Sequence, residues 1–167
     1  MDEFRQQLVS LLPRLRRFAL ALSADPVEAD DLLQTACEKA LQARAQWQPG
    51  SRLDSWLYRI LQNQWIDQQR GRQRHGEVDD PELLEQLPDE RWDRQLEARL
   101  TLERVLEVLA QLPEAMRSVL ALVTVQGLSY QEAAEVLALP IGTVMSRLAR
   151  GRLELMRRLE MTEVGRV

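Results

Sequence analysis

Hydrophobic residues recur along this chain at intervals of three and four positions, with polar residues between them. That spacing is typical of amphipathic helices, and no stretch shows the strict alternation of a half-buried strand. The first such segment predicts a helix over residues 4–22. Pro13 lies inside it and should kink it or split it in two, because proline removes a backbone donor and clashes with the turn before it. The pattern as a whole predicts an all-α fold.

Two more helices are predicted in the first half of the chain. Asp25, Pro26 and Glu28 stand where an N-cap, a first-turn proline and a capping-box partner belong. The second helix therefore begins there and runs to about residue 45. We expect four of its apolar residues to be buried: Leu33, Cys37, Ala40 and Leu41. A Pro-Gly loop at 48–51 leads into a third helix over residues 53–69, which ends in an arginine run.

The third helix has two dissimilar faces. Its apolar face holds Leu53, Trp56, Leu57, Ile60 and Leu61. Its polar face holds Ser55, Arg59, Gln62, Asn63, Ile66 and Arg70, and Tyr58 and Trp65 lie toward the border. Cations, amides and aromatic rings on one surface suit single-stranded nucleic acid. Aromatic residues at helical spacing are more often core, however, and we expect this of Trp56 and Trp65. Asp67 falls on the apolar side, where we expect it to pair with a buried arginine.

Residues 76–93 have the composition of a linker, with one glycine, two prolines and an excess of acid. They divide the chain into an N-terminal helical domain, residues 1–75, and a C-terminal one, residues 94–167. In the C-terminal domain an apolar stripe begins near Arg94, and Pro113 starts a further helix that ends at about residue 123. The stripe comprises Leu96, Leu100, Val105, Leu106 and Leu109.

The segment after Gly127 has the pattern of a helix-turn-helix. Ser129 and Glu132 form a capping box that opens a short helix ending at residue 137, and Pro140 separates it from a second helix. In this motif the second helix enters the major groove, where hydroxyl and guanidinium groups read base edges. Its outward positions are Thr143, Ser146, Arg147 and Arg150, and its inward ones are Val144, Leu148 and Leu155. A plain helical hairpin with a solvated arginine face is the alternative.

Charge is distributed unevenly along the chain, although the net charge is only −4. Residues 1–75 carry a net charge of +2 and residues 76–100 carry −6, so the acid is concentrated around the linker. Of the 22 cationic residues, 21 are arginine. Arginine suits phosphates and base edges, although a GC-rich genome would produce the same bias. The net charge therefore does not exclude a nucleic-acid binder.

Other classes of function find little support in the residues present. With one cysteine (Cys37) and one histidine (His75), the chain offers no internal disulfide, no cysteine zinc site and no nucleophile–base set. We therefore expect no enzymatic activity, no metal and no cofactor. We also expect a cytoplasmic protein without membrane insertion, because we find no signal peptide and no apolar stretch of about 18 residues.

Three blocks of sequence, in this order, resemble the extracytoplasmic-function sigma factors, the smallest sigma factors of bacterial RNA polymerase. Residues 30–34 read D-D-L-L-Q and are similar to the polymerase-binding segment D-D-L-x-Q of that family. Residues 56–67 match W-L-x-x-I-x-x-N-x-x-x-D, its promoter-melting helix. The third block resembles the C-terminal signature, with L-P at 112–113, G-L-S-Y-Q-E-A-A at 127–134 and G-T-V-M-S-R-L at 142–148.

The resemblance implies a role for each region. The second helix would bind the clamp helices of the largest polymerase subunit through Asp31, Leu32, Gln34 and Glu38. The third helix and the loop before it would capture the minus-ten element as a single strand through Ser51, Arg52, Arg59, Asn63 and Arg70. The recognition helix would read the minus-thirty-five element through Thr143, Ser146, Arg147 and Arg150. The resemblance also implies contact with the flap of the second-largest subunit, a linker in the active-site channel and an anti-sigma factor that regulates the protein.

Two departures from the family pattern and two alternative functions complete this interpretation. Thr35 and Cys37 stand where the family usually has an acid and a bulky apolar residue, and Met145 stands where a basic or polar residue is common. The second departure bears on promoter specificity.

A stand-alone helix-turn-helix regulator that does not bind core polymerase would have no use for the first two blocks. An interaction module of a partner-switching cascade, without DNA binding, would have no use for the arginines of the recognition helix.

Overall fold

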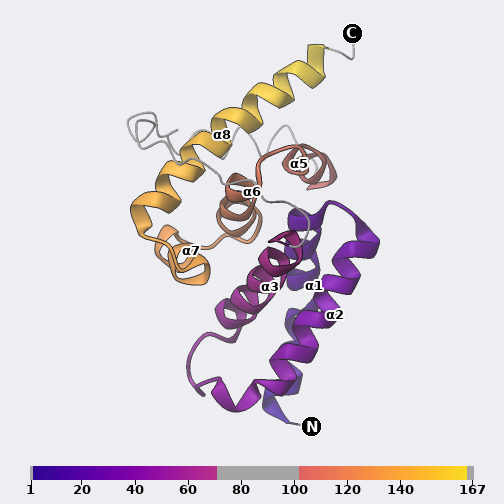
Figure 1. Ribbon diagram of the computed structural model, residues 1–167, viewed down its shortest axis with the longest axis vertical. Helices are drawn as coiled ribbons and strands as arrows, with labels where there is room; N and C mark the ends of the chain where they lie inside the picture. Colours follow the sequence, from indigo (N-terminus) through magenta and orange to yellow (C-terminus); the bar gives the residue numbers. More distant parts are fainter. Residues whose placement is uncertain (1, 71–101, 165–167) are drawn as a thin grey trace.

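The computed structural model describes residues 2–70 and 102–164 (Figure 1). Every regular element within these ranges is helical, which confirms the all-α prediction. The elements are α1 (Glu3–Ser23), α2 (Pro26–Gln42), the 3-10 turn η1 (Arg44–Gln46), α3 (Leu53–Arg70), α5 (Leu102–Leu109), α6 (Glu114–Leu120), the π-helical turn η3 (Ala121–Val125), α7 (Tyr130–Leu137) and α8 (Ile141–Val164). The predicted linker at 76–93 and the predicted start of the C-terminal domain at 94 lie outside the described residues.

The first helix, α1, is continuous through Pro13, so the prediction that proline could split it is wrong. Asp2 caps the first turn by accepting a hydrogen bond from the Phe4 amide at 3.1 Å. Buried residues lie on both sides of the proline, with Leu8 before it and Leu15 after it. They hold both halves of α1 against one core, and this packing outweighs the cost of an internal proline, which is about 3 kcal/mol.

The second helix, α2, begins where predicted but buries a different face. Asp25 is its N-cap and accepts a hydrogen bond from the Val27 amide at 3.2 Å. The buried residues are Ala29, Leu32, Ala36 and Ala40, whereas Leu33 and Cys37 are half-buried and Leu41 is exposed. The predicted burial is thus confirmed for Ala40 and wrong for Leu41, while Leu33 and Cys37 pack against the edge of the core. The true face is displaced by one residue, because three alanines allow α2 to approach α1 and α3 closely.

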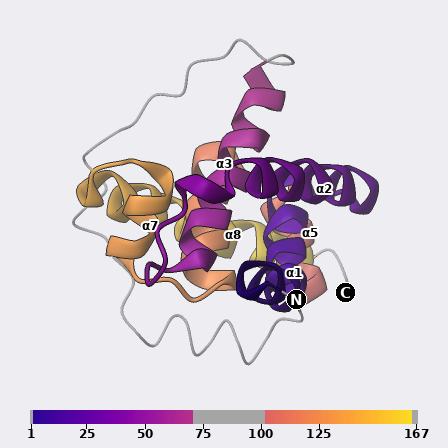
Figure 2. The ribbon, with the colours of Figure 1, turned by 90° about the horizontal axis from the view of Figure 1, so that it is seen from below.

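The third helix, α3, lies between α1 and α2 on one side and α7 on the other (Figure 2). Its buried residues are Leu53, Leu57, Tyr58, Leu61, Gln62 and Trp65. Burial of Trp65 confirms it as a core residue, and Trp56 is half-buried with its ring centroid 6.1 Å from that of Phe4. Two polar predictions are wrong. Gln62 is only 3% exposed because the C-terminal helices cover its face, and Asp67 is exposed.

The helix-turn-helix is formed by α7 and the first turns of α8. Its capping box is confirmed: the Glu132 amide donates to Ser129 Oγ at 3.1 Å, and the Ser129 amide donates to Glu132 Oε1 at 3.0 Å. Gly127 precedes it with a φ of +74°, a left-handed conformation that glycine adopts without strain. The predicted inward residues of α8 are all buried, namely Val144, Leu148 and Leu155.

The N-terminal helices α1–α3 and the C-terminal helices α5–α8 pack against each other (Figure 1). Helix α1 contacts α5, α6 and η3, while α3 contacts α7. The buried apolar residues of both units form one continuous cluster. We call this packing the closed arrangement. Within the two described ranges, no helix is both long enough and apolar enough to cross a bilayer.

Helix α8 packs closely on α6 at Gly151. A Cβ added there would lie 2.8 Å from Leu120 Cδ1 and 3.1 Å from Leu120 Cγ, and Leu120 is itself buried. Replacing Gly151 by valine is therefore expected to lower the free energy of unfolding by about 1–3 kcal/mol, because the added side chain overpacks the core. Urea denaturation followed by circular dichroism measures this change.

Gly142→Val is the matched control, since nothing lies within 4 Å of a Cβ built at Gly142. We expect no loss of stability from it, because the site has room for the side chain and valine has a slightly higher helix propensity than glycine. Equal destabilisation by the two substitutions would contradict the close contact between α6 and α8.

Candidate nucleic-acid interface

The residues predicted to bind the minus-ten element lie on the loop before α3 and along α3 itself. All five are exposed: Ser51, Arg52, Arg59, Asn63 and Arg70. The loop has a defined shape, because Ser51 Oγ donates to the Gln48 carbonyl oxygen at 2.6 Å and Gly50 adopts a φ of +93°. A positive φ of this kind favours glycine, so Gly50 allows the loop to adopt this conformation without strain.

Arg52 lies between the two helical units. Its Nε and Nη2 donate to the carboxylate oxygens of Asp54 at 3.1 and 2.7 Å, and its Nη1 pairs with Glu132 of α7. The hydrogen bond to Asp54 is the main reason that the pKa of Arg52 is raised. Burial by itself would raise the pKa of Asp54. Hydrogen bonds from Arg52 and the Ser55 amide, together with the nearby arginine charges, outweigh burial and hold that pKa below its ordinary value.

Arg59 and Tyr58 also reach the C-terminal unit. Arg59 Nη2 donates to the Glu135 carbonyl oxygen at 2.5 Å, near the end of α7. Tyr58 is fully buried, its hydroxyl donates to Gln126 Oε1 at 2.8 Å, and burial is the main reason that its pKa is raised. Two residues predicted to bind the minus-ten element, Arg52 and Arg59, are therefore engaged by the C-terminal unit in the closed arrangement.

The residues predicted to bind polymerase lie on the outer face of α2, with one exception. Asp31, Gln34 and Glu38 are exposed, and the Gln34 side-chain amide donates to Glu38 Oε1 at 3.4 Å. Leu32 is 0% exposed and does not lie on this exposed face, and its part in polymerase binding stays a prediction. Successive residues on a helix point about 100° apart, and Leu32 takes the inward direction beside Asp31. The face that remains is acidic and polar.

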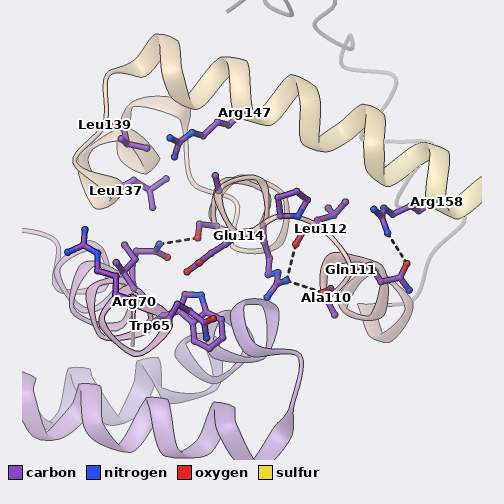
Figure 3. A pocket seen from close by; sticks show the side chains of 17 residues that line it. Trp65, Arg70, Ala110, Gln111, Leu112, Glu114, Leu137, Leu139, Arg147 and Arg158 are labelled. Carbon is purple, nitrogen blue, oxygen red and sulfur yellow. Dashed lines mark hydrogen bonds between the residues drawn. The ribbon is translucent and has the colours of Figure 1, made fainter. Parts of the chain in front are cut away.

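Three of the four residues predicted to read the minus-thirty-five element are half-buried on α8: Thr143, Arg147 and Arg150. Ser146 is only 8% exposed, so its predicted outward position is wrong. Helix α8 packs against α5, α6 and α7 together, and its buried face is consequently wider than its apolar stripe. Arg147 points toward the space between the two units (Figure 3).

A cavity of about 840 Å³ lies between the two helical units (Figure 3). Its lining includes Trp65, Arg70, Leu112, Leu137, Leu139 and Arg147. At this cavity Gln62 Nε2 donates to Ser118 Oγ at 3.0 Å, while Gln62 Oε1 and Trp65 Nε1 are buried without a hydrogen-bond partner. At this cavity the contact between α3 and the C-terminal unit is therefore polar and incompletely satisfied. Nowhere in residues 2–70 and 102–164 do three or more histidine, cysteine or acidic side chains gather as a metal site would require.

No sequence pattern singled out Arg117, yet it joins the two units. Its Nη1 donates to the Leu22 carbonyl oxygen near the end of α1 at 2.6 Å. Its Nη2 donates to the carbonyl oxygens of Ala110 and Leu112, both at 2.9 Å. Burial lowers the pKa of Arg117. The available signal was its position as the one charged residue between 115 and 123, in an otherwise apolar run.

Both helical units match known protein families. Residues 8–75 match Sigma-70 region 2, and residues 102–155 match Sigma-70, region 4. The chain is 35% identical to the ECF RNA polymerase sigma factor EcfG of Rhodopseudomonas palustris (strain TIE-1), over 92% of this chain and 83% of that protein.

Two solved structures have similar folds. The sigma factor RpoE, co-crystallised with the anti-sigma factor NepR from Bartonella quintana, has a TM-score of 0.74 and 28% identity, over 96% of this chain and 98% of that one. CnrH, in complex with the cytosolic domain of CnrY, has a TM-score of 0.68 and 27% identity, over 95% of this chain and 88% of that one. The similarity thus spans both helical units.

The contacts of Asp54 predict a dependence of stability on pH. A carboxyl group whose pKa is lowered on folding stabilises the fold above its unfolded pKa, about 3.9, and that stabilisation is lost as the pH falls through the folded value. We therefore expect the parent chain to lose stability more steeply than Asp54→Asn as the pH falls below about 4. Urea denaturation at a series of pH values between about 3 and 7 measures the difference.

Asp67→Asn is the matched control, because Asp67 is an exposed aspartate on the same helix. We expect this variant to follow the parent chain. If Asp54→Asn follows the parent chain as well, the stabilising contact between Arg52 and Asp54 is not present in solution.

Proposed function

Because this chain belongs to the extracytoplasmic-function sigma factors of bacterial RNA polymerase, we propose a division of labour between its two helical units. The family directs core polymerase to specific promoters, and its members are transcription initiation factors rather than enzymes in themselves. The N-terminal unit binds the polymerase core and captures the minus-ten element. The C-terminal unit reads the minus-thirty-five element. A stand-alone helix-turn-helix regulator is not favoured, because residues 8–75 match Sigma-70 region 2.

Polymerase binding is assigned to the exposed face of α2. Asp31, Gln34 and Glu38 present acidic and polar groups to solvent on one side of the helix, and their partner is the clamp helices of the largest polymerase subunit. The C-terminal unit contacts the flap of the second-largest subunit, and the acidic segment at 76–93 follows the active-site channel. The protein acts in the cytoplasm, where the polymerase is. An anti-sigma factor regulates it, as the partners of RpoE and CnrH in their solved complexes suggest.

Promoter binding is assigned to residues of both units. The minus-ten set is Ser51, Arg52, Arg59, Asn63 and Arg70, and the minus-thirty-five set is Thr143, Arg147 and Arg150. Ser146 leaves the second set because it is buried. The observation that carries this proposal is the exposed row of arginine and amide groups on the loop and helix of the region 2 unit. Such groups follow phosphates and engage unstacked bases.

The closed arrangement differs from the form that binds a promoter. The two promoter elements are about 25 base pairs apart, or about 85 Å at about 3.4 Å per base pair. Helices α3 and α7 are in contact in the closed arrangement. One molecule cannot span that distance while α3 touches α7, so the two units separate before both elements are bound. Isolated protein is accordingly expected to bind promoter duplex weakly.

Run-off transcription with core polymerase tests the function. Core polymerase and fragmented genomic DNA are incubated with and without the protein, and the 5′ ends of the transcripts are sequenced. We expect discrete new start sites that share two upstream motifs. Asp31→Arg is expected to abolish them by reversing the charge of the α2 face, while Glu160→Arg, at an exposed position on α8, is expected to preserve them. No new starts, together with no binding to core polymerase, would refute the proposal.

Two substitutions separate the tasks of the two units. Arg150→Ala is expected to weaken recognition of the upstream element by about 1–3 kcal/mol, the usual cost of a lost base contact. Asn63→Ala is expected to slow strand opening while core binding stays intact, because an amide on α3 engages bases only once they are unstacked. Promoter variants measure the first effect, and permanganate footprinting measures the second. Unchanged melting with Asn63→Ala, or equal transcription by the parent protein from matched and mutated upstream elements, would contradict this division.

A further inference from the structure

Two arginines of the proposed DNA-binding surface already hold partners from the other unit. Arg52 pairs with the carboxylate of Glu132, in the first turn of α7. Arg59 donates to the carbonyl oxygen of Glu135, near the end of the same helix. Helix α7 thus meets both arginines, one at each of its ends. These contacts place α7 over the part of α3 that is proposed to capture single-stranded DNA.

Both acceptors resemble a phosphate in their electrostatics. Glu132 offers a full negative charge, and the Glu135 carbonyl lies in the last turn of α7, where the helix dipole gives a partial negative charge. Guanidinium groups bind carboxylate and phosphate oxygens in the same way, through charge-assisted N–H···O hydrogen bonds. The acceptors on α7 therefore offer Arg52 and Arg59 what a nucleic-acid backbone would offer them.

Arg52 can exchange its partner on α7, Glu132, while it keeps its partner in its own unit, Asp54. Asp54, in its own unit, holds the Nε and Nη2 edge of the guanidinium through two hydrogen bonds, and Arg14 lies 3.7 Å from the same carboxylate. The remaining amino group, Nη1, faces Glu132. The Arg52 side chain is 54% exposed, so a DNA strand can reach it from solvent. Asp54 is thus a positioning residue that keeps Arg52 directed outward whichever partner it holds.

The contact around these arginines contains buried polar groups that are only partly satisfied. Tyr58 donates to Gln126, and Gln62 donates to Ser118, but Gln62 Oε1 and Gln126 Nε2 are buried without partners of their own. Buried polar groups without partners disfavour the state that buries them. Interfaces of this polar kind between units of one chain usually permit relative motion. Separation of the units gives these groups access to water.

We propose that α7 acts as an internal substitute for DNA, in which Glu132 and the Glu135 carbonyl occupy the binding positions of backbone phosphates on Arg52 and Arg59. Single-stranded promoter DNA and α7 therefore compete for the same guanidinium groups, and binding of the strand favours release of the C-terminal unit. This inference rests on the proposed function, because it assumes that Arg52 and Arg59 contact the minus-ten strand. It adds to that function a direct coupling between strand capture and separation of the units.

Glu132 permits a selective test. Glutamine at the third position of a helix maintains a capping box as glutamate does, so Glu132→Gln removes the charge that faces Arg52 and keeps the N-terminus of α7 capped. Glu160→Gln is the matched control: it removes one negative charge at an exposed position near the C-terminal end of α8, in the same unit as Glu132. Binding of a fluorescein-labelled single-stranded oligonucleotide, which carries the mapped minus-ten sequence, is measured for each variant by anisotropy.

We expect Glu132→Gln to bind the oligonucleotide about two- to fivefold more tightly than the parent chain, the range of one exposed ion pair, and Glu160→Gln to match the parent. The gain should disappear when Arg52 is also replaced by alanine. Equal gains from both glutamine variants would overturn the inference, since net charge would then explain them. A gain that persists without Arg52, or no oligonucleotide binding by any variant, would also overturn it. Run-off transcription by the parent chain is scored separately, so the proposed function can stand when this inference fails.

Discussion

The structure depends on a polar contact between α3 and the C-terminal unit. The same side of α3 that buries Gln62 and Tyr58 against that unit carries Arg59, which is proposed to meet DNA. The two units also share an apolar cluster through α1, whereas on the α3 side each neutral hydrogen bond contributes only about 0.5–1.5 kcal/mol. The bonds from Tyr58 to Gln126 and from Gln62 to Ser118 are of this kind. The polar surface of α3 can therefore exchange its partners on α7 for another polar partner.

Two arginines connect the units in opposite directions. Arg59 of the N-terminal unit donates near the end of α7, and Arg117 of the C-terminal unit donates to the Leu22 carbonyl near the end of α1. Each guanidinium donates to a carbonyl near the C-terminal end of a helix, where the helix dipole gives a partial negative charge. Water can satisfy the same carbonyls when the units separate. These contacts give the closed arrangement a defined geometry. They bury little charge that would oppose separation of the units, although Arg117 is buried enough for its pKa to be lowered.

Features that depend on a few neighbouring residues were predictable from the sequence, and features that depend on packing between helices far apart in the chain were not. The capping box of Ser129 and Glu132 lies within four positions, and it formed as predicted. The burial of Gln62 depends on Ser118, 56 residues later. Ser146 is buried because α8 meets several helices at once, and Leu32 is buried because small residues let α2 approach its neighbours. Helical periodicity predicts that one face of a helix is buried. How wide that face is, and around which residues it is centred, depends on the helices that pack against it.

The distance between the units in two states tests the central claim that α3 meets α7 and DNA in turn. Spin labels at Gln42 and Gln131, both exposed, report it by double electron–electron resonance in a chain where Cys37 is replaced by serine. We predict one narrow distance for the free chain, in agreement with the closed arrangement, and a much longer one in the complex with core polymerase and promoter DNA. The same distance in both states, or a broad distribution in the free chain, would contradict the account.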